Sequence, residues 1–347
     1  MPDRPREPMP QRAVPLRPTG LRRPDRSRPT VKLALTGQLP AHPATADHLA
    51  GVREWNGRTN TRYGTCGPVN CANSAIMTWK QLLGTEISVS DDAVFDLYRR
   101  SGNPTFDPQT GQGDDGVDMT VMLAALVKGG LEITLPDGTT QQAVPYVFAE
   151  VGVQGDQEAM HAGTAIFGGM SFAFDLDQAQ NGQTNAGLWD YVPASRPWGG
   201  HAVFGGAYTS ATDPHALDES IITWQQRVGT TPGFISHQLY GAYVIVWAPL
   251  WENPAFVAGV DRAALVADFE ALTGRPWTGP PVPPPPEPEP PQPPPSPEPP
   301  PSPAPDAVLA DYLGDARLIG WAGKRHLGDN GYAARAYARL RDAEGAR

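Results

Sequence analysis

The chain contains two cysteines, and both lie in the short stretch 64-GTCGPVNCANSAIMTW-79. Cys66 precedes Gly67 and Pro68, and proline is favoured in the first turn of an α-helix. A helix that begins here would place the Cys66 sulfur among backbone N–H groups without helical partners, where the helix dipole stabilises a thiolate. The pattern therefore predicts a nucleophilic cysteine, with Gly67 leaving room beside it for a substrate backbone.

Cys71 lies one turn further along the same helix, next to Ala72 and an apolar stripe, and is expected to be a small packing residue. Other roles stay open for the pair. Cys71 itself is a second candidate nucleophile, and a Cys66–Cys71 disulfide is another option, although a cytosolic chain would keep it reduced. A zinc site would need more ligands at suitable spacing, so we expect no metal and no other cofactor.

A histidine that can activate this thiol lies in 199-GGHAVFGGAY-208. His201 follows two glycines and opens a run of small and apolar residues that is expected to form a strand. An imidazole beside a thiol accepts its proton and so makes the sulfur nucleophilic. The sequence therefore predicts a Cys66–His201 pair for attack on a carbonyl carbon.

These motifs resemble those of the papain-like cysteine peptidases, in which cysteine and histidine stand about 130–150 residues apart; here the separation is 135 residues. The opening TCGP is most similar to the C39-like branch. The runs 199-GGHAVFGGAY-208 and 221-IITWQQRVGTTPGF-234 resemble cysteine-peptidase-like proteins encoded by actinobacterial phages. The resemblance covers roughly residues 50–250. It implies an α+β fold, with a helical half that carries the cysteine followed by an antiparallel sheet half that carries the histidine.

The resemblance also implies two supporting residues. An amide side chain six residues before the nucleophile stabilises the oxyanion in this family, and Asn60 occupies that position here. The residue that orients the histidine is left with three options. Alignment on Trp224 puts Ile222 at the family's Asn position, where it cannot bond an imidazole. A one-residue deletion puts Thr223 there, which we prefer, and Gln225 is the third option.

Apolar periodicity and turn residues predict helices first and strands afterwards in the central region, an order typical of α+β domains. Gly84 is expected to end the first helix, and Asp115 or Asp118 to cap the third. The expected helices cover 69–83, 91–100, 118–130 and 156–167, and the expected strands cover 131–135, 169–176, 201–209, 220–224 and 240–247.

Composition divides the chain into four parts. Residues 1–44 form a basic Arg- and Pro-rich arm that is typical of disorder. Residues 45–277 have a globular composition, and the resemblance implies that they form a papain-like domain. Residues 278–305 are dominated by proline, which forms a semi-rigid polyproline II linker. Residues 306–347 show helical periodicity but are too few to fold alone, so we expect this tail to dock on a protein partner or on another copy.

Charge and hydropathy restrict the possible partners. The net charge of −10 argues against nucleic-acid binding by the chain as a whole, although the basic arm leaves such a contact open. No apolar run reaches the length of a membrane span, and the N-terminus is unlike a secretory signal. We expect a peptide or protein substrate, synthesis in the cytoplasm and, given the phage resemblance, association with a virion.

The sequence thus favours a thiol-dependent peptidase or amide hydrolase that its tail tethers to a partner. One alternative is a non-enzymatic virion or assembly protein on a degenerate peptidase scaffold. The absence of the family's orienting Asn agrees with this alternative. Another is a cell-wall amidase of the NlpC or CHAP type, in which the Cys–His separation is usually shorter. Loss of hydrolysis on Cys66→Ala would separate the enzyme from the scaffold.

Overall fold

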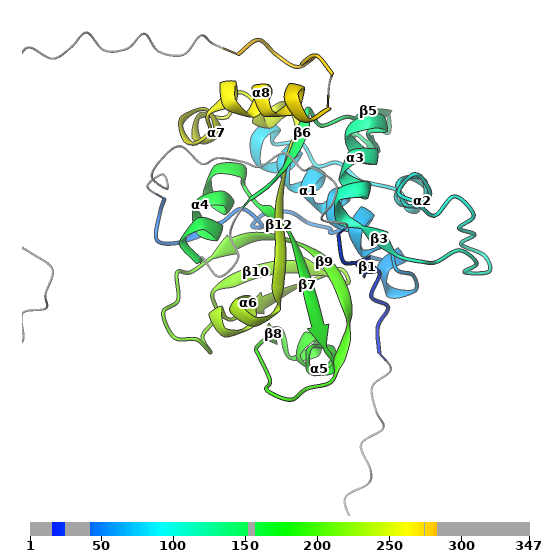
Figure 1. Cartoon of the computed structure of the whole chain (residues 1–347), viewed down its shortest axis with the longest axis vertical. Coiled ribbons are helices and arrows are strands. Elements are labelled where there is room, and N and C mark those ends of the chain that lie inside the picture. Colours follow the sequence, from blue (N-terminus) through cyan, green and yellow to red (C-terminus); the bar gives the residue numbers. More distant parts are fainter. Residues whose placement is uncertain (1–15, 25–41, 152–156, 274, 283–347) are drawn as a thin grey trace, which may run out of the picture. The chain divides into compact units, whose positions relative to one another are not determined.

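The computed structural model describes residues 16–24, 42–151, 157–273 and 275–282. They form a mixed α+β structure with a large, mostly antiparallel sheet (Figure 1), which confirms the predicted α+β class. The proline-rich linker beyond residue 282 and the tail at 306–347 lie outside the described residues. In the part of the chain that the structure describes, no helix is long and apolar enough to cross a bilayer.

Four helices occur close to where the apolar periodicity predicts them, and the helices from α5 onward were not predicted. Their bounds are α1 Cys66–Leu83, α2 Asp91–Arg100, α3 Met119–Gly129, α4 Gln157–Phe167, α5 Gln178–Ala186, α6 Pro232–Gln238, α7 Pro254–Gly259 and α8 Arg262–Thr273, with 3₁₀ turns η1 Thr59–Thr61 and η2 Ala248–Leu250. In Figure 1, α7 and α8 lie at one end of the sheet, and α5 lies at the other.

The main sheet has the strand order β6–β12–β7–β9–β10–β11–β8, and its neighbours are antiparallel except for β11 and β8. The bounds are β6 Val147–Glu150, β7 Met170–Asp177, β8 Leu188–Trp189, β9 Pro197–Tyr208, β10 Glu219–Thr223, β11 Gln226–Thr230 and β12 Leu239–Val246. The long strand β9 lies in the middle of this order, so a residue on β9 is supported by strands on both sides.

Shorter strands extend this framework. Both β1 (Leu21–Arg22) and β2 (Ala46–Asp47) pair with β9, and β1 also pairs in parallel with β3 (Val117–Asp118). A separate hairpin consists of β4 (Leu131–Thr134) and β5 (Thr140–Ala143). Because β1 joins β3 to β9, it bridges the helical region and the sheet.

Helix α1 packs between the sheet and the pair α2–α3 (Figure 1), and it is buried continuously from Cys66 to Trp79. Two of its buried polar side chains form hydrogen bonds toward the sheet side, which offsets part of the cost of burying them. Asn70 Nδ2 donates to Ser171 Oγ at 2.9 Å, and Trp247 Nε1 donates to Ser74 Oγ at 2.9 Å. These bonds fix the start of α1 against the sheet.

The expected helix ends are largely correct. Gly84 ends α1 in the left-handed region at a φ of 64°, where glycine is favoured. Of the two aspartates considered for α3, Asp118 is the cap, since its carboxylate accepts from the backbone N–H of Thr120 at 2.8 Å. This cap fixes the junction between β3 and α3 beside the start of α1.

The predicted disorder of residues 1–44 is wrong for residues 16–24. Gly20 O accepts a hydrogen bond from Val117 N at 2.7 Å, and Leu21 is 6% exposed within the main core cluster. An Arg- and Pro-rich segment cannot form a core of its own, but here the rest of the protein supplies the contacts. Residues 1–15 and 25–41 lie outside the described residues.

Candidate active site

Cys66 is the first residue of α1, and its side chain is fully buried. Hydrogen bonding from the backbone of Ala202, Gly20 and Gly67 acts to lower the pKa of the Cys66 thiol. Burial has the larger effect and raises the pKa of Cys66, because a charged sulfur is disfavoured away from water. In this closed arrangement the sulfur is therefore a neutral thiol surrounded by donors suited to a thiolate.

Gly67 has a different role from the predicted one. A Cβ added at Gly67 would lie 2.6 Å from Met122 Sδ and 2.7 Å from Val117 Cγ2. Glycine is thus required so that the first turn of α1 can pack against α3 and β3. The space that the sequence suggested for a substrate is filled by the core.

His201 lies on β9, fully buried, and its Nε2 is 2.8 Å from Thr223 Oγ1. The Trp224 ring stacks on the imidazole with a centroid separation of 4.3 Å and an interplanar angle of 15°. Nδ1 has no hydrogen-bond partner among the described residues. If Nε2–H donates to the threonine hydroxyl, Nδ1 carries the lone pair of a general base.

Burial lowers the pKa of His201 to about 3. The unfolded chain, with an ordinary histidine pKa of about 6.5, takes up a proton between these values that the folded protein does not. The free energy of unfolding is therefore expected to fall as the pH is lowered from 6.5 toward 3. Urea titrations at pH 7 and 4.5 should show this loss, and His201→Gln should reduce it by about 2 kcal/mol; an unchanged loss would contradict the assignment.

Helix α1, which begins with Cys66, packs on β9, which carries His201. Hydrogen bonding from the backbone of Ala202, the residue directly after His201, acts to lower the pKa of the Cys66 thiol. Cys66 and His201 thus come from separate elements that pack on each other. Among the described residues, no hydrogen bond joins the Cys66 sulfur to the imidazole, and His201 Nδ1 has no hydrogen-bond partner.

Of the three options for the third residue, the structure places Thr223 on the imidazole. Ile222 packs instead in an apolar cluster with Leu49 and Phe204. Gln225 lies in the turn between β10 and β11 at a φ of 66°. Because side chains alternate along a strand, Thr223 points to the histidine and Ile222 to the other face.

Asn60 lies in the turn η1, and its side chain is 1% exposed. The same turn is tied to the residue before the nucleophile, since Thr59 Oγ1 and Thr65 Oγ1 are 2.9 Å apart. Asn60 Oδ1 has no hydrogen-bond partner in the described structure. The unpartnered atom is an acceptor, so it could take a hydrogen bond from a donor group, whereas an oxyanion would need the Nδ2 donor of the same amide.

Cys71 is buried in the core and not bonded to Cys66. Its sulfur lies 4.0 Å from Met122 Sδ, and burial raises the pKa of its thiol. These surroundings are those of a packing residue. Over the residues that can be described, no group of three His, Cys, Asp or Glu side chains is placed to hold a metal ion.

Residues 16–24 lie beside the start of α1, a feature that sequence reasoning missed. Gly20 lies against Gly64 and Gly116, and its backbone acts to lower the pKa of the Cys66 thiol. Figure 1 shows β1 beside β3 at the edge of the helical region. The available signal was the set of glycines around Cys66 and His201, which allow another backbone to approach closely.

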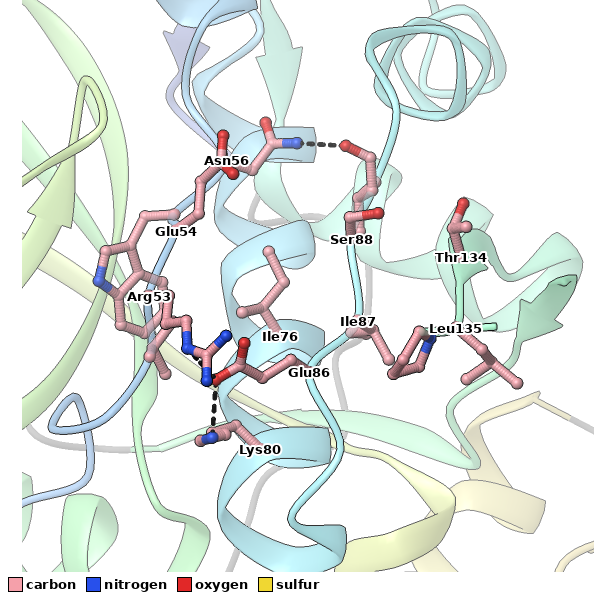
Figure 2. Close-up of a pocket in the computed structure, with 14 residues that line it drawn as sticks. Arg53, Glu54, Asn56, Ile76, Lys80, Glu86, Ile87, Ser88, Thr134 and Leu135 are labelled. Atoms are coloured by element: carbon pink, nitrogen blue, oxygen red, sulfur yellow. Dashed lines mark hydrogen bonds and ion pairs between the residues drawn. The ribbon is translucent and has the colours of Figure 1, made fainter. Parts of the chain in front are cut away.

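A separate pocket of about 450 Å³ lies near the C-terminal half of α1, away from Cys66 (Figure 2). Ile76 and Ile87 form part of its lining. Three of its charged side chains are paired, because Lys80 Nζ is 2.7 Å from Glu86 Oε1 and Arg53 Nε is 3.4 Å from the same oxygen. The pocket contains none of the four predicted site residues.

No protein-family model and no curated protein sequence matches the chain. Among solved structures, it is similar to xylellain, a cysteine protease from Xylella fastidiosa, with 14% identity, a TM-score of 0.49, and coverage of 68% of this chain and 99% of that one. It is also similar to proCathepsin B S9 from Trypanosoma congolense (12% identity, TM-score 0.47, 66% and 86% covered). The Carica candamarcensis cysteine protease CMS1MS2 is a further example (15%, 0.43, 59% and 98%). At such low identities and TM-scores, the function has to be argued from the site itself.

Proposed function

We propose that the chain is a thiol-dependent peptidase or amide hydrolase with Cys66 as nucleophile and His201 as general base. One observation carries this proposal: α1 begins at Cys66 and packs on β9, where His201 has its Nε2 bonded to Thr223 and its Nδ1 unpartnered. A buried cysteine has no structural need for a donor-rich surrounding, whereas a reacting sulfur does.

In the first half of the reaction, His201 Nδ1 takes the proton of Cys66 and the sulfur attacks the carbonyl carbon of the substrate. The C=O electron pair moves to oxygen, and Asn60 Nδ2 together with a backbone N–H near Cys66 stabilises the oxyanion. When the pair returns, the C–N bond breaks and His201 delivers its proton to the leaving amine. The product is a thioester on Cys66.

In the second half, His201 removes a proton from water, and the resulting hydroxide attacks the thioester carbon. The C–S bond breaks, the carboxylic acid leaves, and the sulfur recovers the proton from His201. Thr223 holds the imidazole so that Nδ1 remains the base throughout. Trp224 excludes water from the opposite face of the ring by stacking on it.

The motifs TCGP and GGHAV support placing this site among the papain-like peptidases, in the C39-like branch. In this proposal residues 45–277 form the catalytic domain, and the linker at 278–305 lets the tail at 306–347 bind a partner or another copy. The phage origin and a place on the virion are supported only by the resemblance of residues 199–208 and 221–234.

The test is cleavage of a complex peptide mixture, with new peptide termini identified by mass spectrometry. The chain is assayed both as it is and with Gly20→Ala, because residue 20 lies beside the start of α1. New termini should appear, and carbamidomethylation of Cys66 should remove them. Termini that persist after Cys66 is fully alkylated, or no termini from a chain with a reactive Cys66, would contradict the proposal.

The second candidate is a non-enzymatic assembly protein on the same scaffold. It is favoured by the threonine in place of the family's orienting Asn and by the closed state of the site. This candidate predicts that Cys66 can be replaced without loss of function, so the test above decides between the two.

Thr223→Ala is expected to lower kcat by about 10- to 100-fold while KM changes little, since the imidazole loses the bond that fixes its tautomer and orientation. Thr223→Ser keeps the hydroxyl and should retain most of the activity. The kcat and KM values of both variants check this. Equal losses for alanine and serine would show that the bond to His201 is not the reason for the effect.

A further inference from the structure

A second group of side chains with the chemistry of a hydrolase lies outside the Cys66 site. Ser210 Oγ is 3.4 Å from His161 Nδ1, and His161 Nε2 is 3.1 Å from Asp218 Oδ2. Ser210 and Asp218 lie in the loop between β9 and β10, and His161 lies on α4. A serine, an imidazole and a carboxylate linked in this order can form a nucleophilic site, which is recognised by its geometry and not by sequence position.

The Asp218 carboxylate determines which nitrogen of His161 carries the proton. Besides the imidazole, it accepts from Gln157 Nε2 at 2.8 Å and from the backbone N–H of Ala211 at 3.0 Å. An ionised carboxylate only accepts, so Nε2 is the protonated nitrogen of the ring. Nδ1 therefore carries the lone pair, and this is the nitrogen next to Ser210.

The neighbouring carboxyl group of Glu219 does not compete with Asp218 for this role. Glu219 is fully buried, and its Oε1 accepts from Thr164 Oγ1 at 3.3 Å. Burial, together with the negative charge of Asp218, raises the pKa of Glu219 well above its usual range. Asp218 therefore supplies the negative charge that stabilises a protonated His161.

The same carboxylate also holds the loop that carries the serine. Asp218 Oδ1 accepts from the N–H of Ala211, the residue directly after Ser210. The backbone N–H of Thr209, the residue directly before it, donates to Asp218 O at 3.0 Å. Both neighbours of Ser210 are thus tied to the residue that orients its base.

The backbone at Ser210 has an uncommon conformation. Its φ is 53°, in the left-handed region that few residues other than glycine adopt. Strained residues persist where the surrounding structure holds them, and they are frequent at functional sites. Ser210 is half-buried, whereas His161 and Asp218 are 0% and 1% exposed. The serine therefore remains partly accessible beside a base that is shielded from water.

The imidazole is also fixed in its plane. The Tyr208 ring stacks on His161 with a centroid separation of 4.3 Å and an interplanar angle of 11°. The contact between Ser210 Oγ and Nδ1 is longer than a usual hydrogen bond, and catalytic hydrogen bonds are often long until the substrate binds. Only the serine side chain has to move for the contact to shorten.

A small cavity beside the loop indicates the size of the substrate. Its volume is about 240 Å³, and its lining includes Tyr208 and Thr209, which precede Ser210, together with Leu217 near the end of the loop. This is below the usual range for drug-sized ligands. A short acyl chain fits such a volume, whereas a folded peptide segment does not.

We propose that Ser210, His161 and Asp218 form a second hydrolytic site, which cleaves short-chain acyl esters. Ser210 is the nucleophile and His161 the general base, and Asp218 is a positioning residue that acts through the imidazole. The proposal is independent of Cys66 and of the peptidase function.

In the first half of the reaction, His161 Nδ1 takes the proton of Ser210 as Oγ attacks the ester carbonyl carbon. The C=O electron pair moves to oxygen and returns, the C–O bond to the alcohol breaks, and His161 protonates the leaving alcohol. In the second half, His161 takes a proton from water and the hydroxide attacks the acyl carbon. The bond to Oγ breaks, the carboxylic acid leaves, and Ser210 recovers its proton from His161.

The first test is sulfonylation by phenylmethanesulfonyl fluoride at neutral pH, with the modified serines mapped by mass spectrometry. The full chain carries Cys66→Ala, so that the proposed thiol nucleophile is absent. Oγ bonds to the sulfur of the reagent, fluoride leaves, and His161 passes the serine proton to solvent. Ser210 should react at least about 100-fold faster than Ser236, since base catalysis contributes about 10²- to 10⁴-fold.

Ser236 is the matched control within the same molecule. Its Oγ is 3.0 Å from His237 Nδ1, which is closer than Ser210 is to its histidine. However, that nitrogen is also 2.8 Å from Gly233 O, a pure acceptor, so it carries a proton and cannot act as a base. Equal rates at Ser210 and Ser236 in the folded chain would overturn the proposal, and this comparison needs no substitution in the core.

Asp218→Asn tests the positioning role. The amide N–H₂ would face Nε2, so the imidazole should take the opposite tautomer, with its proton on Nδ1, and Ser210 should be sulfonylated at least about tenfold more slowly. The ¹⁵N chemical shifts of the His161 ring report the tautomer, which a merely structural effect would not reverse. A reversed tautomer with an unchanged rate would refute the role of His161 as base.

The last test is turnover of p-nitrophenyl esters by the Cys66→Ala chain. Acetate and butyrate should be hydrolysed faster than dodecanoate, and Ser210→Ala should abolish this activity. Protection of the buried Cys71 from iodoacetamide shows that each variant is folded. Sulfonylation of Ser210 without hydrolysis of acetate or butyrate would refute the esterase. Because Cys66 is absent, neither result bears on the proposed peptidase.

Discussion

Replacing Cys66 by alanine should abolish peptide cleavage, because no other group in the site can form the thioester. The expected loss is about 10³-fold or more, down to what binding and oxyanion stabilisation alone provide. The assay compares initial rates of cleavage in the Gly20→Ala background, in which the clash of a Cβ with Gly64 is expected to displace residues 16–24. Measuring rates in this background keeps a closed site from being mistaken for an inactive one.

Cys71→Ala is the control for this experiment. Both cysteines are buried in the same helix, so both substitutions remove a similar volume from the core. Cys71→Ala should lower stability slightly and leave the rate per folded molecule unchanged. If the two variants lose activity equally, the effect comes from packing, and Cys66 is not the nucleophile.

Replacing His201 by alanine should lower kcat by about 10²- to 10⁴-fold, the usual contribution of a general base. The imidazole is also needed to generate the thiolate below the ordinary cysteine pKa of about 8.5. In the Gly20→Ala chain, Cys66 should therefore react rapidly with iodoacetamide at pH 6. Without His201, the reaction should become fast only as the pH approaches 8.5.

The pH profile of alkylation separates chemistry from structure. A merely structural histidine would change the rate by the same factor at every pH, whereas a proton acceptor changes the shape of the curve. His161→Ala is a suitable comparison, because His161 is equally buried but lies on α4, bonded to Asp218. If the profile of His201→Ala runs parallel to that of the natural chain, the thiol–imidazole pair does not exist.

Much of the fold could be predicted from the sequence because it follows local rules. The apolar spacing of α1, the glycine at its end and the aspartate cap of α3 depend only on neighbouring residues. Helix α5 escaped prediction because 178-QAQNGQTNA-186 has no apolar stripe. It is stabilised by tertiary contacts instead, for example the bond from Trp189 Nε1 to Thr184 Oγ1 at 2.9 Å.

In the candidate site, too, some features follow from neighbouring residues and others from tertiary contacts. Cys66 and His201 were named from their flanking glycines and their separation, and the choice of Thr223 over Ile222 depended on strand register, which the sequence left open. The order of residues 16–24 could not be predicted, since nothing within that segment stabilises it. Its stability comes from glycines and acceptors that lie 40 to 180 residues away, roughly the separations of Gly64 and Gly200 from Gly20.

The neutral state of the buried sulfur also determines how fast Cys66 is oxidised. Peroxide and disulfides react with a thiolate far faster than with a thiol, and only the first oxidation step is readily reversed. A buried Cys66 with a raised pKa escapes this damage. Burial thereby keeps the Cys66 sulfur in its reduced form, even in an oxidising environment.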